Sequence, residues 1–600
     1  MSEQASGPGL RVWAPRPDRV AAVVDGRTVA AEPAGGGWWV ADVPAERLVA
    51  GARYAWSLDG GPPRADPRGR RLPDGVTGPS QVIDLEAHRW TDAGFRAPPL
   101  ASWAIYELHV GTFTAAGTFD AAIERLDHLV ELGVTTVEVM PVAAFPGRHG
   151  WGYDGVGLYA VHEPYGGPAA FQRFVDACHG HGLAVVLDVV YNHLGPLGNH
   201  LAEFGPYFTD RVATPWGDAV NLDGADSDEV RRFLVDNARQ WLRDFHVDGL
   251  RLDAVHALHD ESARPFLADL ADEVAALGAA EARPLVLIAE SDRSDPRLIE
   301  PAEAGGDGLD GMWADDLHHA LHVALTGEGE GYYEDFTGTP TEIADVVAHG
   351  YRFRGTWSPH RRRRHGRALD PATPLHRLVA ALQTHDQVGN RARGDRLGHL
   401  VPPERLYAAT ALVLTAPHVP MLFQGEEWAA STPFLYFTDH PDPALAEAVR
   451  LGRRLEFAAF GWRPDEVPDP QDAATRDASV LAWDERDGAP HAEVLVWYRA
   501  LLALRRAEPA LRDARQSAVA ATGDDDGGVV VVCRGELVVV ADVGGRGAAV
   551  EIPAAPAGAG VAGPAERQPE VLLASPGSGL DGERAAVAPG GAVILRRPSR

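Results

Sequence analysis

Apolar runs of strand length alternate with amphipathic helical patterns through the middle of the chain, from about residue 103 to residue 423. This alternation is typical of βα units, in which helices join parallel strands. Eight runs are expected to be strands: 104–109, 136–140, 184–190, 250–253, 285–289, 311–313, 379–384 and 420–423. Eight parallel strands are enough to close a (β/α)₈ barrel, and we predict this α/β fold for the region.

Three acidic residues stand at the ends of three of these runs: Asp253, Glu290 and Asp386. The C-terminal ends of barrel strands gather at one face, so the three carboxyl groups are expected to meet there. Arg251 precedes Asp253 by two positions and should therefore point to the same side of its strand. We expect a raised pKa for Glu290, which follows an apolar strand, and an ionised Asp253 beside Arg251.

The flanks of the chain differ from the middle. Short strand-like runs between Gly and Pro in the first ninety or so residues favour an immunoglobulin-like or carbohydrate-binding-module-like β-sandwich, with its tryptophans in the core rather than on sugar. The interval between the second and third barrel strands is too long for a simple connection and is expected to build part of the substrate cleft. A mainly helical stretch and an all-β domain follow the barrel. We predict domains at 1–95, 96–512 and 513–600.

Composition excludes several functions. The formal net charge of -30 argues against nucleic acid and anionic membranes as partners, because both require a basic surface. The chain contains no lysine, which excludes Schiff-base chemistry and a Walker A phosphate loop. Cys178 and Cys533 show no metal-ligand spacing, and the N-terminus lacks a basic region followed by an apolar one. We expect a cytoplasmic protein without cofactor or metal ion.

Four stretches carry a resemblance to a known family. Residues 188–193 (DVVYNH), 249–253 (GLRLD), 289–292 (AESD) and 384–386 (THD) occur in order at expected strand ends. Together they resemble the four sequence regions of the α-amylase family of glycoside hydrolases and transglycosidases. The resemblance implies that Asp253 is the nucleophile, that Glu290 is the general acid and base, and that Asp386 is a third carboxylate that holds sugar hydroxyls. Retaining hydrolysis places the first two carboxyl groups about 5 to 5.5 Å apart.

The resemblance also implies a set of substrate-binding residues. His193 and His385 would donate hydrogen bonds to one glucose, and Tyr153 would stack on it. The other expected substrate-binding residues are Arg251, His256, Trp313, Asp315, Asp316, Gln387 and Arg391.

Other polar residues are expected to be structural. This applies to Asp188 and Asp248 as hydrogen-bond partners, to the run 361–364 as a solvated loop and to residues 426–428 as part of the barrel rim. Asn192 matches a calcium ligand of some family members, but one such match is poor evidence for a calcium site.

Four further pieces, at 72–80, 313–319, 385–391 and 433–440, resemble the family members that act on maltooligosyltrehalose. This implies hydrolysis of the α-1,4 bond next to the terminal trehalose unit, and a functional link to an enzyme that forms this α-glucan substrate. A glycogen branching or debranching enzyme is the main alternative, although those enzymes usually carry an acidic residue where Gln387 stands. A glucan-binding protein without activity is a further alternative.

Overall fold

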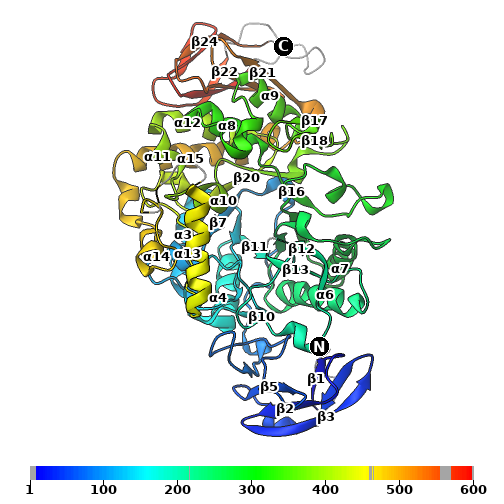
Figure 1. Cartoon of the computed structure of the whole chain (residues 1–600). Helices are drawn as coiled ribbons and strands as arrows, with labels where there is room; N and C mark the ends of the chain where they lie inside the picture. The colour runs from blue at the N-terminus through cyan, green and yellow to red at the C-terminus, as the bar shows by residue number, and fades with distance from the viewer. Residues whose placement is uncertain (1–8, 215, 459–462, 464, 554–568, 598–600) are drawn as a thin grey trace.

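Three parts follow one another along the long axis of the molecule: an N-terminal sheet, a central barrel and a C-terminal pair of sheets (Figure 1). The computed structural model describes residues 9–214, 216–458, 463, 465–553 and 569–597. The first eight residues, on which the expectation about the N-terminus depends, lie outside the described residues. The predicted domain boundaries at 95 and 512 stay predictions.

The central part is a closed parallel barrel of eight strands, as predicted. Hydrogen bonds join the last strand to the first, with Met421 opposite Ile105 in the register. The strands are β7 (Ile105–Leu108), β8 (Thr136–Val139), β11 (Ala184–Val189), β14 (Gly249–Leu252), β15 (Val286–Ala289), β16 (Gly311–Trp313), β19 (Leu378–Ala381) and β20 (Val419–Phe423).

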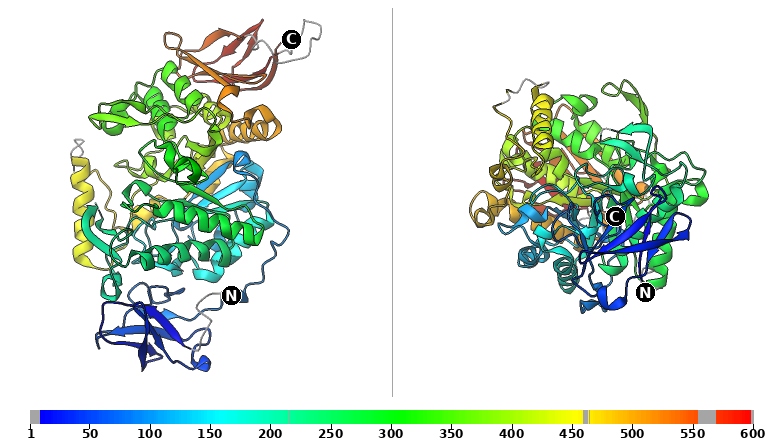
Figure 2. Two further views of the ribbon diagram at one scale, coloured as in Figure 1. Left: turned by 90° about the vertical axis from the view of Figure 1, so that its right-hand side faces the viewer. Right: turned by 60° about the horizontal axis from the view of Figure 1, so that its bottom comes forward.

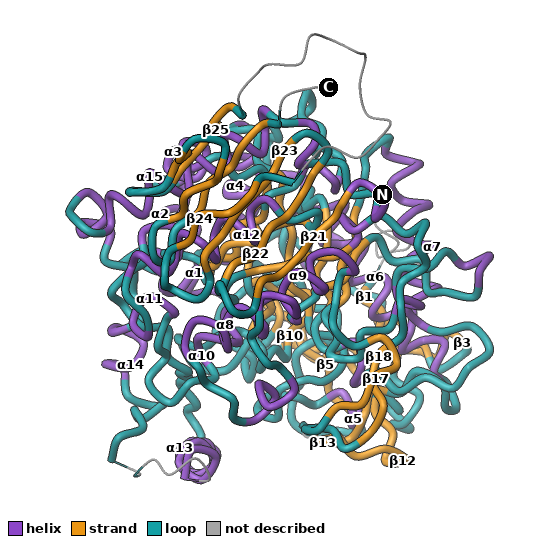
Figure 3. The backbone as a smooth tube through the Cα atoms, turned by 90° about the horizontal axis from the view of Figure 1, so that it is seen from above, coloured by secondary structure: helices purple, strands orange, loops and turns teal. Residues whose placement is uncertain are grey.

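Amphipathic helices surround the barrel. α6, the helix before β14, buries Val230, Phe233 and Trp241 on the side that faces the barrel. The main helices of this part are α3 (Leu126–Leu132), α4 (Gly167–Gly180), α6 (Ser227–Asp244), α7 (Phe266–Glu281), α8 (Asp316–Thr326), α9 (Pro340–His349) and α12 (Pro403–Thr415). The expected helical extension follows the barrel, as α13 (Pro443–Ala458) and α15 (His491–Ala507), and α13 lies at the margin of the molecule (Figures 2 and 3).

The long connection after β8 forms the expected excursion. It contains the antiparallel pair β9 (Ala143–Ala144) and β10 (Gly157–Val161), and the loop between them carries Tyr153. The Tyr153 hydroxyl reaches Asp188 and His385 at the barrel strand ends. The excursion therefore adds a side chain to the open face of the barrel.

The N-terminal part is all-β, as predicted. Its strands are β1 (Leu10–Trp13), β2 (Val20–Val24), β3 (Arg27–Gly35), β4 (Trp38–Ala41), β5 (Arg53–Leu58) and β6 (Ser80–Gln81). The first half of β3 pairs with β2 and the second half with β4, so this strand connects the two sets of paired strands. Trp13 and Trp56 are buried, which confirms their core role, and Trp13 also packs edge-on against Tyr207 of the barrel part.

The C-terminal part is also all-β. One sheet contains β21 (Val519–Asp524), β22 (Val529–Arg534), β23 (Leu537–Asp542), β28 (Ala592–Arg596) and β25 (Glu570–Ala574), and the other contains β24 (Ala548–Glu551), β27 (Arg584–Val587) and β26 (Gly579–Asp581). The fully buried Arg534 donates hydrogen bonds to the carbonyls of Thr415, Leu511 and Asp513. These bonds fasten this part to the end of α12 and to the segment after α15.

Candidate active site

Asp253 lies one residue beyond β14, at the C-terminal end of the barrel. Its Oδ1 accepts a hydrogen bond of 2.8 Å from Arg251 Nη1, and its Oδ2 accepts one of 2.8 Å from Asn192 Nδ2. Arg251 is fully buried and also donates to both carboxylate oxygens of Asp188, at 2.9 and 2.8 Å. The guanidinium and the carboxylate therefore share one side of the strand, as expected, and the hydrogen bond between them is charge-assisted.

Glu290 lies one residue beyond β15, on the other side of Arg251. Its Oε2 accepts the Ala254 N–H at 2.5 Å and lies 3.7 Å from Arg251 Nη2. Burial raises the pKa of Glu290 to about 8, with Asp253 and Asp386 adding to the increase against the opposing effect of Arg251. The expected raised pKa is confirmed, so the side chain can hold a proton at neutral pH.

Asp386 is the second residue of the short helix α10 (His385–Gly389) and is the most exposed of the three acids, with 45% of its side chain accessible. His385 beside it is fully enclosed: its Nδ1 and backbone N–H both bond to Glu107, and its Nε2 bonds to the Tyr153 hydroxyl at 2.8 Å. Burial opposes the charged imidazole, but Asp386 and Glu107 outweigh it and raise the pKa of His385 to about 9. Its neighbours therefore favour the protonated ring, and each ring nitrogen has a protein partner.

A cavity of about 340 Å³ opens beside Asp386, and its lining also includes Trp313, Asp315, Asp316 and Gln387. Gln387 Nε2 donates to Asp315 Oδ1 at 3.3 Å, and the guanidinium of Arg251 lies 4.3 Å from the centre of the Trp313 ring. Burial raises the pKa of Asp315 to about 7. The carboxyl and amide groups of this lining suit a sugar ring, whereas the Trp313 ring is only 4% exposed and Arg251 covers one of its faces.

Asp316 differs from Asp315 in its bonds. Its Oδ2 accepts the backbone N–H groups of Arg352 at 2.6 Å and Phe353 at 3.4 Å. Burial raises the pKa of Asp316 to about 6 against these bonds. The side chain therefore holds a neighbouring chain segment, and its expected contact with substrate stays a prediction.

Three other expected substrate-binding residues have protein partners. His193 Nε2 bonds to the Tyr153 carbonyl at 3.0 Å, and the ring stacks on Trp216 at 4.5 Å. His256 lies 3.8 Å from Asp292 Oδ1 and lines a different cavity. Arg391 forms a two-point ion pair with Glu328, with both bonds at 2.8 Å. Their roles towards sugar stay predictions.

The residues expected to be structural have structural contacts. Asp248 lies at the opposite end of its strand from Asp253 and bonds to His179, the Val185 N–H and Arg283. Glu426 and Glu427 are both buried. Glu426 accepts a hydrogen bond from Tyr498, and Glu427 bonds to Tyr106 and His128. Both therefore lie inside the protein rather than at the rim of the barrel. The Asn192 amide nitrogen donates to Asp253, which makes this side chain a support for the carboxylate.

Sequence reasoning missed two acids inside the barrel, Glu107 on β7 and Glu138 on β8. Both are 1% exposed and face each other across the paired strands. Burial raises the pKa of Glu138 well above its usual range, with Glu107 adding to the increase. In the sequence, each acid stands in the middle of an apolar strand. This position could have marked both as site residues, because a buried charge requires a partner nearby.

The described residues contain no group of three or more metal-binding side chains arranged around one point. None of the described helices is long and apolar enough to cross a membrane.

Comparisons with known proteins agree with this geometry. The family model described as the catalytic domain of alpha amylase matches residues 88–204. A malto-oligosyltrehalose trehalohydrolase from Arthrobacter ramosus is 54% identical over 531 residues, which cover 88% of this chain and 91% of the relative. A relative of the same name from Saccharolobus solfataricus is 43% identical over 77% of this chain and 78% of its own.

The fold agrees with a crystal structure of a putative alpha amylase from Salmonella typhimurium. The TM-score is 0.88 at 36% identity, and the match covers 98% of this chain and 97% of the other. Because the similarity covers 91% and 78% of these two relatives at 54% and 43% identity, the chain belongs to the malto-oligosyltrehalose trehalohydrolases within the α-amylase family of glycoside hydrolases.

Proposed function

We propose that the chain hydrolyses the α-1,4-glucosidic bond next to the terminal trehalose unit of maltooligosyltrehalose and releases trehalose and a maltooligosaccharide. The observation that carries the chemistry is the arrangement around Arg251, which donates to Asp253 on one side and lies beside Glu290 on the other. The names of the relatives supply the substrate.

A carboxyl group with a raised pKa, Glu290, next to a second carboxyl group bonded to Arg251 suits a double displacement. Asp253 attacks the anomeric carbon while the proton of Glu290 passes to the leaving oxygen, so that a β-glucosyl ester forms and the sugar on the leaving side departs. Glu290, now anionic, takes a proton from water, which attacks the same carbon and releases Asp253. Each step inverts the anomeric centre, and the product keeps the α configuration.

The cavity beside Asp386 supplies a site for the trehalose unit. Asp315 and the amide of Gln387 offer both acceptors and donors to sugar hydroxyls. An amide at 387 favours this hydrolase over a branching or debranching enzyme, in which an acidic residue is usual. We also propose a cytoplasmic location and a functional link to an enzyme that forms maltooligosyltrehalose.

The test compares maltooligosyltrehalose with a maltooligosaccharide of equal length. Chromatography should find free trehalose from the first and much slower cleavage of the second, and proton NMR of early products should show the α anomer. Equal cleavage of both substrates, or no trehalose, would contradict the proposal. New α-1,6 linkages formed from amylose would instead support a branching enzyme.

A further inference from the structure

An arginine-lined groove lies beside the loop that follows Glu290. Its walls come from residues 293–297 and from β18 (Arg363–Gly366) with the residue after it; β18 forms a hairpin with β17 (Arg354–Ser358), which does not line the groove. The groove has a volume of about 460 Å³ and is lined by Arg293, Ser294, Asp295, Arg297, Arg363, Arg364, His365, Gly366 and Arg367. We call this feature the arginine groove.

Positive charge in the arginine groove exceeds the negative charge around it. Arg297 is paired with Asp295, Nε to Oδ2 at 2.9 Å, and Arg367 is paired with Glu300. The remaining three arginines, at 293, 363 and 364, have no carboxylate partner among the described residues. This concentration of unpaired cations occurs in a chain with a formal net charge of -30, so it runs against the overall charge of the protein.

Two of the three unpaired arginines bond only to backbone carbonyls. Arg293 Nη2 donates to the His256 carbonyl at 2.6 Å, and Arg364 Nη1 donates to the Gly355 carbonyl at 3.1 Å. A guanidinium carries five N–H donors in a planar fork, so most of these donors remain available. Several forks around a concave surface match the oxygens of a phosphate group better than a single cation does.

We propose that the arginine groove binds a small phosphate dianion, either inorganic phosphate or the phosphate group of a sugar monophosphate. The volume of about 460 Å³ leaves room for either ligand. The acidic character of the rest of the chain disfavours extended polyanions, because these would also meet negative surface. Neutral sugars lack the charge that three unpaired guanidinium groups favour.

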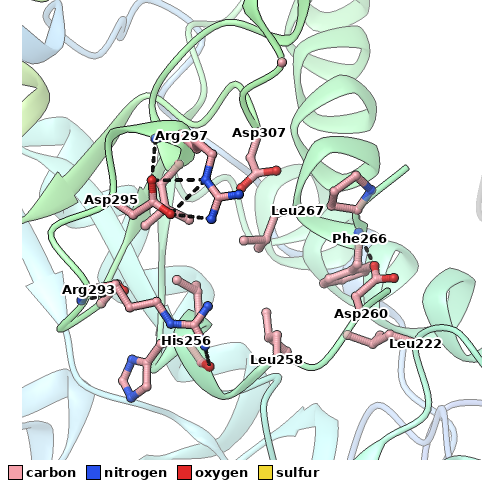
Figure 4. A pocket seen from close by; sticks show the side chains of 15 residues that line it. Leu222, His256, Leu258, Asp260, Phe266, Leu267, Arg293, Asp295, Arg297 and Asp307 are labelled. Atoms are coloured by element: carbon pink, nitrogen blue, oxygen red, sulfur yellow. Dashed lines mark hydrogen bonds and ion pairs between the residues drawn. The ribbon is translucent and has the colours of Figure 1, made fainter. Parts of the chain in front are cut away.

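The arginine groove is joined to the candidate active site through backbone contacts. Arg293 holds the carbonyl of His256, three residues after Asp253, and His365 Nε2 bonds to the Asp292 carbonyl at 2.8 Å, two residues after Glu290. Figure 4 shows Arg293 at His256 and Arg297 at Asp295 on the wall of a neighbouring cavity of about 230 Å³. A phosphate that binds Arg293 competes with the hydrogen bond from Arg293 to the His256 carbonyl. Loss of this bond changes substrate binding at the active site, an effect that rests on the proposed function.

Calorimetric titration of the full chain with inorganic phosphate, glucose 6-phosphate and glucose tests binding directly. At constant ionic strength, the two phosphates should saturate one site, and glucose should not compete for it. The double variant R363A/R364A should raise the dissociation constant about tenfold or more, since each lost charged hydrogen bond contributes on that scale. Tighter binding of glucose 6-phosphate than of inorganic phosphate would identify a sugar monophosphate as the preferred ligand of the arginine groove.

R362A is the matched control, because Arg362 belongs to the same run but does not line the arginine groove. It should bind phosphate as the unaltered chain does. No saturable binding, equal binding by R363A/R364A, or equal loss in R362A would overturn the proposal. D253N should keep phosphate binding, so a failure of the proposed reaction is distinguishable from a failure of this site. If bound phosphate leaves KM unchanged, the coupling through His256 is overturned.

Discussion

Glu107 accepts two hydrogen bonds from His385, one from the backbone N–H at 3.0 Å and one from the ring Nδ1, although 278 positions separate the two residues. The carboxylate therefore fixes both the rotation of the imidazole and the start of α10, where Asp386 follows. Because His385 Nε2 meets the Tyr153 hydroxyl, one buried acid on the first barrel strand orients groups from the seventh strand end and from the excursion after β8.

Glu107→Gln should lower the pKa of His385 from about 9, because one of the two anions that raise it is removed. We expect kcat/KM for maltooligosyltrehalose to fall about tenfold or more, since a charge-assisted bond becomes a neutral one. NMR titration of the His385 ring checks the first effect and steady-state kinetics the second. An unchanged ring titration would show that Glu107 does not control the charge of His385.

Asp253→Asn should reduce kcat by about a thousandfold or more, equivalent to at least about 4 kcal/mol of activation free energy. The amide oxygen can still accept the bond from Arg251, but a neutral amide cannot attack the anomeric carbon. The thermal unfolding midpoint should stay close to that of the unaltered chain. Turnover near the original rate would show that another group is the nucleophile.

The activity should decline as pH rises through about 8. The raised pKa means that Glu290 is protonated below this pH, holds the proton needed by the leaving oxygen, and loses it above. A pH profile of kcat/KM with maltooligosyltrehalose measures the effect. An aryl maltooligoside whose phenol leaves without protonation serves as the control, and its profile should lack this alkaline decline. Identical profiles for both substrates would argue against Glu290 as the acid.

Asp315 and Asp316 should respond in opposite ways to replacement by alanine. Asp316→Ala should lower the free energy of unfolding by about 1 to 3 kcal/mol, because two buried backbone N–H groups lose their acceptor. Asp315→Ala should instead raise KM while changing stability little, because its bond to Gln387 is long and burial disfavours its charge. Denaturant unfolding and kinetics on both variants separate the two roles, and a large stability loss at Asp315 would contradict this assignment.

The sequence predicts the barrel well because each strand is a local pattern: an apolar run, buried on both sides, between two helices. The barrel in turn predicts that Asp253, Glu290 and Asp386 lie together, because the C-terminal ends of all its strands are at one face. β3 was not predicted, since Pro33 and Gly35 interrupt its pattern and its partners change halfway along the strand.

Partners distant in the chain could not be predicted in the same way. Nothing local to Glu107 indicates His385, and nothing near Arg391 indicates that Glu328 binds it. The same limit applies to Asp316, whose neighbours in sequence suggest a sugar contact while its carboxylate binds a distant backbone. Strand periodicity reports which way a side chain points, but not what it meets there.

Closure of the barrel between β20 and β7 has a consequence for synthesis of the protein. The ribosome makes Asp253 and Glu290 well before residues 419–423, so both acids are present while the barrel still has two free edges. Glu107 lacks its hydrogen-bond partner until His385 has been made, just after the seventh barrel strand. Asp253 and Glu290, in contrast, follow their partners Asn192, Arg251 and Ala254 in the chain. All three acids of the site are therefore present before the last strand closes the barrel.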